Sequence, residues 1–225
     1  MMTRFADRAE AGRALAVRLM EYAGEPDTLV LALPRGGVPV AFEIAIALDA
    51  ELDVLIVRKI GVPWNPEYAV GAIANDGIAV LDAAFMNRLG LTRSDLAPVL
   101  RAEVRELERR ERLYRGDRPY PELQGHTVLL VDDGLATGST MLAAVKAVRS
   151  RRPRRVVVAV PIASAEACAD LDRVADRTVC LETPEPFYGV GVWYEDFSET
   201  SDEQVLALLA EARRRHLKAP ASVSA

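Results

Sequence analysis

The chain has 225 residues, of which 50% are hydrophobic and 6% aromatic, and its formal net charge is -5 at pH 7. This composition is that of a globular protein with one sizeable core, and the acidic balance argues against nucleic acid as the main partner. The sequence has no apolar run long enough to cross a membrane, and its first residues lack the apolar centre of a secretory signal. We therefore expect a cytoplasmic protein without a membrane span.

Short apolar runs alternate with helical patterns along the chain, which predicts an α/β fold with an open, mostly parallel sheet flanked by helices. A first helix carries Ala11, Leu15 and Leu19 on one stripe, and a second begins near Pro39. The predicted strands are apolar throughout, as expected for strands covered on both faces. They span residues 28–33, 53–57, 69–74, 127–131, 155–160 and 178–181, and two more helices span residues 164–175 and 202–215.

A long segment interrupts this alternation between the third and fourth predicted strands. Within about residues 85–120, Leu96, Leu107 and Tyr114 fall near one face of a charged amphipathic helix, which predicts a helical insertion. Its arginines either form a solvated face paired with nearby glutamates, or belong to a lid whose cations reach an anionic substrate. We expect residues 1–218 to form a single domain that includes this insertion, followed by a disordered tail at 219–225.

The spacing of the cysteines and histidines predicts neither a metal cage nor a reactive thiol. Cys168 and Cys180 are too far apart for a CxxC motif, and His126 and His216 lie in unrelated segments. We expect both cysteines to serve as packing residues.

The segment "VLLVDDGLATGST", residues 128–140, concentrates polar groups directly after an aliphatic strand. In an open α/β sheet, ligands bind at the carboxyl ends of the strands, where Asp132 and Asp133 would emerge. The following turn enters a helix, so its amides and hydroxyls predict a site for a phosphate monoester. The alternative is that these residues only cap the helix. The P-loop spacing and its lysine are missing.

This segment resembles the 5-phosphoribosyl-1-pyrophosphate (PRPP) motif of the type I phosphoribosyltransferases, and the chain looks most like the uncharacterised bacterial members of that family. The resemblance implies a Mg²⁺-dependent transfer of 5-phosphoribosyl from PRPP to a nitrogenous base, with release of pyrophosphate. It implies that Asp132 and Asp133 act in catalysis, hold the ribose and bind Mg²⁺ directly or through water. The residues implied to bind the 5-phosphate are Ala136, Thr137, Gly138, Ser139 and Thr140.

Two further segments fit the resemblance at the pyrophosphate end. The loop with Arg35, Gly36 and Gly37 corresponds to the family's pyrophosphate loop, whose non-proline cis peptide maps onto Pro34–Arg35. A plain turn before a helix would explain the glycines without Arg35. At the end of the second predicted strand, Arg58 and Lys59 are candidates for contact with pyrophosphate, and Lys59 is the favoured catalytic residue.

Aromatic residues gather in a predicted C-terminal hood at about residues 182–200. Phe187, Tyr188 and Trp193 are candidates for binding the acceptor base, although the rings of this segment could equally pack the C-terminal helix onto the sheet. The N-terminal "RFADR" segment could close over the same region.

The acceptor itself is left open, because Ala136 stands where the 6-oxopurine enzymes of the family carry an aspartate. The implied partners are PRPP and a nucleobase-like acceptor, and we expect a homodimer. Two alternatives remain, a non-catalytic regulator that senses PRPP or nucleotides and a phosphoribosyl-binding hydrolase. A regulator that binds nucleic acid could use the arginines at 149, 151, 152, 154 and 155, although these are expected at the edge opposite the ligand.

Overall fold

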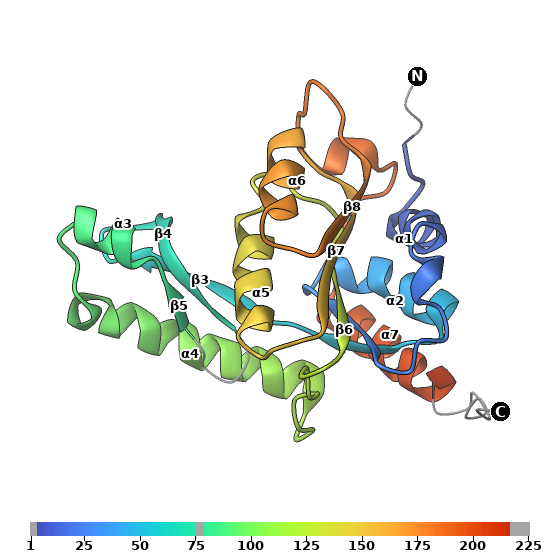
Figure 1. The fold of residues 1–225 in the computed structure, drawn as a ribbon, viewed down its shortest axis with the longest axis horizontal. Helices are drawn as coiled ribbons and strands as arrows, with labels where there is room; N and C mark the ends of the chain where they lie inside the picture. The colour runs from blue at the N-terminus through green and yellow to red at the C-terminus, as the bar shows by residue number, and fades with distance from the viewer. Residues whose placement is uncertain (1–3, 75–78, 217–225) are drawn as a thin grey trace.

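The computed structural model describes residues 4–74 and 79–216, and it confirms an α/β fold built on a parallel sheet (Figure 1). Five parallel strands pair in the order β2-β1-β6-β7-β8. Their bounds are Thr28–Ala32 for β1, Glu51–Val54 for β2, Thr127–Val131 for β6, Arg155–Ile162 for β7 and Arg177–Glu182 for β8.

Helices cover both faces of this sheet because successive strand residues point to opposite sides. In β1, Val30 and Ala32 join the core under α1, α2 and α7, whereas Leu29 and Leu31 join the core under α5 and α6. Both cores are aliphatic, which explains the continuous apolar runs in the sequence. The bounds are Arg8–Val17 for α1, Gly37–Leu48 for α2, Ser139–Arg149 for α5, Ala165–Asp172 for α6 and Asp202–His216 for α7, with short 3-10 turns at Met20–Tyr22 (η1) and Gly191–Trp193 (η3).

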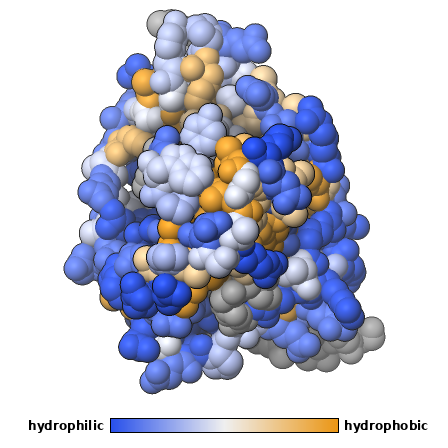
Figure 2. Space-filling view, turned by 90° about the vertical axis from the view of Figure 1, so that its left-hand side faces the viewer, coloured by the Kyte–Doolittle hydropathy of each residue, from blue (hydrophilic) through white to orange (hydrophobic). Residues whose placement is uncertain are grey.

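A second sheet, antiparallel and in the order β3-β4-β5, projects from the body and forms what we call the arm, together with α3 (Figure 1). Its strands are β3 (Val57–Val62), β4 (Asn65–Ala74) and β5 (Ala79–Leu81), and α3 spans Ala83–Arg88. Figure 2 views the molecule from the side of the arm, where hydrophobic residues interrupt a mostly hydrophilic surface.

The arm corrects two predicted strands. The predicted strand at 53–57 is divided, because β2 ends at Val54 and β3 begins at Val57 in the other sheet. The predicted strand at 69–74 belongs to β4 of the arm and not to the parallel sheet. Both errors have one cause, since an apolar run reports burial but not the sheet in which a strand pairs.

The predicted insertion is confirmed as α4, a helix over Arg93–Arg115 that begins with a capping box at Thr92 and Asp95. Its apolar face packs against the core through Leu96, Leu107 and Tyr114, as the helical spacing predicted. Within the described ranges, no helix is long and apolar enough to cross a membrane.

The cysteines differ from expectation, since a disulfide joins Cys168 of α6 to Cys180 of β8. No local pattern indicated this pair, because the proximity of the two cysteines depends on α6 packing beside β8. The predicted disordered tail at 219–225 lies outside the described residues.

Candidate functional site

Two loops meet at the carboxyl edge of the parallel sheet, because β1 and β6 are neighbours with Ala32 opposite Val131. One loop follows β1 and contains the cis Pro34–Arg35 peptide that the family resemblance implied. The other follows β6 and carries Asp132 and Asp133. A Cβ atom added to Gly36 would lie 2.0 Å from Oδ2 of Asp133, so only glycine permits this approach.

The two aspartates form a strained pair of like charges. The side chain of Asp133 is 15% exposed, and its backbone amide donates to Oδ1 of Asp132 at 2.9 Å. Burial, reinforced by the charge of Asp133, raises the pKa of Asp132 well above its ordinary value. Burial also raises the pKa of Asp133, although its partner Arg8 opposes this shift. Carboxylates with raised pKa values and too few cationic partners are typical of a site whose ligand brings a cation.

Arg8 is the one basic residue whose side chain is paired with either aspartate in the described structure. Its Nε donates to Oδ2 of Asp133 at 2.8 Å, and its guanidinium carbon lies 4.0 Å from the centre of the Phe197 ring. Sequence reasoning did not single out Arg8, because the contact joins residues 125 positions apart. The only signal was the expectation that the N-terminal segment could close over the hood region.

The hydroxyl-rich turn lies where the motif predicted it, at the start of α5. Gly138 occupies the N-cap position with a left-handed φ of 68° and has no side chain to cap the helix, whereas Thr137 Oγ1 accepts from the Ser139 amide at 3.4 Å. Thr137 and Ser139 place their hydroxyls 3.1 Å apart beside the first helical turn. The capping alternative accounts for this one amide, and the other amides at the start of the helix can bind an anion. Ala136 is fixed nearby, since its carbonyl accepts from Ser164 Oγ at 2.8 Å.

The hood lies against the aspartate loop. Tyr194 donates its hydroxyl to the carbonyl of Asp133 at 2.7 Å, and a Cβ on Gly134 would meet Val190 at 2.4 Å. Tyr194 and Phe197 stack with ring centres 5.0 Å apart. Tyr194 also contacts Phe5, and Phe197 lies against Arg8, so both rings meet the N-terminal segment. Among the three predicted base-binding residues, Tyr188 is 78% exposed, whereas Phe187 and Trp193 are partly buried.

The three cations predicted at the pyrophosphate end lie on different elements and have different partners. Arg35 pairs with Glu199 and lies 3.8 Å from Asp202. Arg58 and Lys59 lie within β3 of the arm, which corrects their predicted place at the end of a strand in the parallel sheet. Arg58 donates to Glu103 of α4 at 2.7 Å, whereas Lys59 is exposed and has no ion pair in the part of the chain that the structure describes.

The insertion helix reaches the same edge as the glycine loop. A pocket of about 300 Å³ is lined by both segments and by the start of α7. Glu106, accepting hydrogen bonds from Arg109 and Arg110, has its pKa lowered to about 2. Burial and the hydrogen bond to Asp202 raise the pKa of Tyr114 to about 12, so its hydroxyl stays protonated. The lining residues are Pro34, Arg35, Arg109, Arg110, Tyr114 and Asp202.

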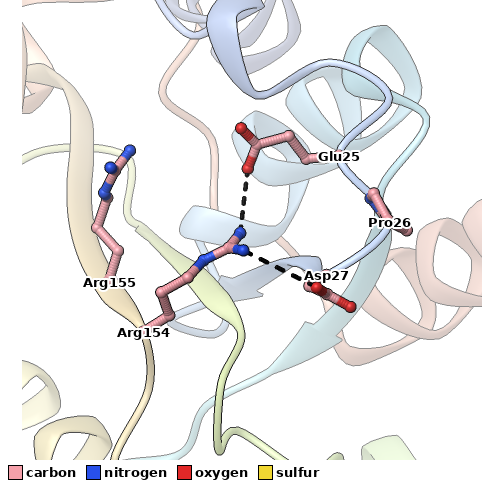
Figure 3. Close-up of a pocket in the computed structure, with 5 residues that line it drawn as sticks. All are labelled: Glu25, Pro26, Asp27, Arg154 and Arg155. Atoms are coloured by element: carbon pink, nitrogen blue, oxygen red, sulfur yellow. Dashed lines mark hydrogen bonds and ion pairs between the residues drawn. The ribbon is translucent and has the colours of Figure 1, made fainter.

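A larger depression of about 510 Å³ lies at the opposite, amino edge of the sheet (Figure 3). Arg154 lies there between Glu25 and Asp27, at 3.3 and 3.9 Å, while Arg155 extends away from these two acids (Figure 3). Arg149, at the end of α5, pairs with Asp176 at 2.9 Å. These arginines of the predicted cluster are therefore largely neutralised, which weakens the case for nucleic-acid binding.

The chemistry of the aspartate pair fits a magnesium ion. No group of three or more potential ligand residues occurs among the described residues, so these residues offer no complete protein cage. Mg²⁺ is commonly held by one or two carboxylates, with water and substrate oxygens completing its shell. Asp132 and Asp133 supply two such carboxylates beside a backbone cradle that a Cβ on Gly36 would fill.

A doubly covered parallel sheet with a glycine loop, two carboxylates and a glycine-capped helix start at one edge is typical of α/β proteins that bind sugar phosphates or nucleotides. The profile described as "Phosphoribosyl transferase domain" matches residues 3–196 of the chain. The chain is 45% identical over 220 residues to "Putative phosphoribosyl transferase Rv0571c" of Mycobacterium tuberculosis, covering 98% of this chain and 49% of that protein. The chain belongs to the phosphoribosyltransferase family.

Two solved structures share the fold of this chain. TT1426 from Thermus thermophilus is 45% identical, with a TM-score of 0.84 over 93% of this chain and 99% of that chain. AQ2163 from Aquifex aeolicus, at 13% identity and a TM-score of 0.51, covers 82% of this chain and 78% of that chain and shows the fold alone. The chain spans about half the length of the mycobacterial relative.

Proposed function

We propose that the protein is a Mg²⁺-dependent phosphoribosyltransferase that moves 5-phosphoribosyl from PRPP to a nitrogenous base and releases pyrophosphate. The observation that carries this proposal is the contact between the two loops, in which Gly36 lies directly against Asp133. A ligand with a diphosphate at one end and a diol at its centre fits such a junction. Family membership supports the same donor.

Each part of the edge has a role in this proposal. The 5-phosphate is bound by the amides and hydroxyls of the turn from Thr137 to Thr140. Ala136, whose carbonyl accepts a hydrogen bond from Ser164, belongs to the same phosphate site. Asp132 and Asp133 would hold the ribose hydroxyls and the magnesium ion, which when bound would neutralise charge on the pyrophosphate. The amides of Arg35, Gly36 and Gly37 receive the growing negative charge of the leaving group.

The cations near the leaving group belong to two elements. Arg109 and Arg110 of α4 line one pocket with Arg35, which supports the interpretation of this helix as a lid whose cations reach an anionic substrate. Lys59 and Arg58 remain candidates for contact with pyrophosphate. Both lie on β3, so they would reach it from the arm. The hood residues Phe187, Tyr188 and Trp193 are candidates for stacking on the acceptor base.

The test separates catalysis from sensing. We expect calorimetry to detect Mg²⁺-dependent binding of PRPP that Asp133→Asn weakens, and a screen of purine and pyrimidine bases to identify one that triggers pyrophosphate release. Binding without release for any base would favour the non-catalytic regulator. No binding of PRPP at all would refute both roles.

The homodimer is also part of the proposal. Trp64 and Tyr68 of the arm are 66% and 57% exposed, and aromatic residues are enriched in protein interfaces. Light scattering coupled to size exclusion should give twice the mass of one chain, and Trp64→Ser should shift the protein toward the monomer. A monomeric wild-type protein would refute this part alone.

A further inference from the structure

Arg8 occupies the position in which a cation would compensate Asp133. Its Nε lies 2.8 Å from Oδ2 of Asp133, and its Nη1 donates to the carbonyl of Ser198 at 2.8 Å. Only 12% of the Arg8 side chain is exposed, so the pair is shielded from solvent and from salt. One side chain thus connects the proposed donor-binding acid to the hood.

The hood holds Arg8 in place through backbone and ring contacts. Phe5 donates its amide to Trp193 at 3.0 Å and accepts from Glu195 at 2.8 Å, so the N-terminal segment runs beside the hood. The Phe197 ring lies 4.0 Å from the Arg8 guanidinium carbon, within the range of a cation–π contact. A charge fixed from three sides is a built feature and not a mobile surface arginine.

Building on the proposed function, we propose that Arg8 is an internal counter-ion of Asp133 that the donor and its magnesium displace, and that this release loosens the hood. The same carboxylate cannot keep its arginine and also face a metal or a ribose diol, because its exposed surface is small. When the arginine leaves Asp133, the acid loses its side-chain link to Ser198 and Phe197. Donor binding would thus be coupled to the mobility of the segment proposed to receive the acceptor.

Competition between Arg8 and the donor predicts an unusual direction of effect. Removing a cation from an anion-binding protein ordinarily weakens binding, whereas Arg8→Gln should strengthen the binding of PRPP with Mg²⁺ by about tenfold, because no arginine has to be displaced. The matched control is Arg13→Gln, on the same helix. Arg13 is 59% exposed and pairs with Glu43 at 3.3 Å, so its loss should leave the affinity unchanged.

The coupling to the hood has its own readout. The chain has two tryptophans, and a Trp64→Phe background leaves Trp193 as the only one, at the start of the hood's contact with Phe5. Adding PRPP and Mg²⁺ should change the Trp193 emission. In the Arg8→Gln variant the emission should resemble the bound state before any ligand is added.

The experiment is calorimetry with PRPP and Mg²⁺ together with Trp193 fluorescence, on the full chain, with circular dichroism to check folding. If the wild-type chain does not bind PRPP, the proposed function fails and the role of Arg8 fails with it. If the wild-type chain binds but Arg8→Gln binds equally or more weakly, or leaves the unliganded Trp193 emission unchanged, only the role of Arg8 is overturned. Should Arg8→Gln misfold, Phe197→Leu tests the same point, because it loosens Arg8 without altering Asp133 and should also strengthen binding.

Discussion

The two edges of the parallel sheet both concentrate charge, but they balance it differently. At the amino edge, Arg149 and Arg154 each face an acid that is well exposed. At the carboxyl edge, two adjacent carboxylates have one partly buried arginine, which pairs with Asp133, and burial raises the pKa of both acids. Charges paired one to one at an exposed surface contribute little. Charges buried with too few partners store unfavourable energy that a ligand can relieve.

The two edges also differ in the shape of their surface. The depression of about 510 Å³ at the amino edge is lined by two acids that already pair with Arg154, so its size alone does not mark a site. The carboxyl edge is marked instead by close approach, since Gly36 and Gly37 bring backbone against the aspartate loop. Chemistry and close packing identify the site better than volume does.

The largest expected effect comes from breaking that close approach. In Gly36→Ala, the new methyl group would lie 2.0 Å from Oδ2 of Asp133 and would push the two loops apart. We expect calorimetry to show a loss of PRPP affinity of more than about 100-fold, since geometry this tight tolerates no displacement. Gly24→Ala is the control for backbone strain, because its φ of 72° disfavours alanine although a Cβ there has open space. It should lower stability but leave PRPP binding by the folded protein intact. Equal binding by both variants would contradict the proposed junction.

The sequence predicted the carboxyl edge well because its signals are local. Asp132, Asp133 and the turn to Thr140 follow a short apolar strand, and the cis Pro34–Arg35 peptide lies in the loop to which the family resemblance assigned it. The parallel sheet and α4 follow from apolar period and length. These features depend on residues that are close in the sequence, so their pattern can be recognised there.

The arm and the hood contacts could not be predicted in the same way. The apolar run through Leu55 and Ile56 does not reveal that the chain leaves one sheet for another between Val54 and Val57. Arg8 lies at Asp133 because the N-terminal segment packs beside the hood. Pairing between distant segments is decided by tertiary packing, for which one sequence carries no periodic signal.

The next effect in size tests whether α4 belongs to the carboxyl edge. Replacing both Arg109 and Arg110 by glutamine should raise the Kd for PRPP by about tenfold, because two cations beside the diphosphate end are lost. The control removes the same charge from the same helix at the exposed Arg101 and Arg105. If both double variants weaken binding equally, general charge attraction explains the effect and α4 is not a lid.

A smaller effect should appear in the stability of the empty protein. Asp132→Asn removes one of two partly buried like charges and keeps the Oδ1 acceptor for the Asp133 amide. Because the folded pKa of Asp132 is raised, ionisation costs stability as the pH rises above its ordinary value of 3.8. In metal-free buffer we expect the variant to be more stable by about 1 kcal/mol at pH 7 and no more stable near pH 3. Denaturant unfolding at the two pH values measures this, and a destabilised variant at pH 7 would contradict the interpretation of the pair as strained.

The smallest effect is expected at the amino edge, where removing one charge of an exposed pair should hardly change stability. Arg149 and Asp176 are each 38% exposed, so water and salt screen their attraction, and Asp176 keeps a second partner in the Val156 amide at 2.7 Å. Arg149→Gln should therefore lower the free energy of unfolding by about 0.5 kcal/mol or less, and added salt should shrink the difference. PRPP affinity should not change, because this edge lies at the opposite ends of the strands. A loss of several kcal/mol, or any change in PRPP affinity, would show that the two edges are not the separate environments that their charge pairing indicates.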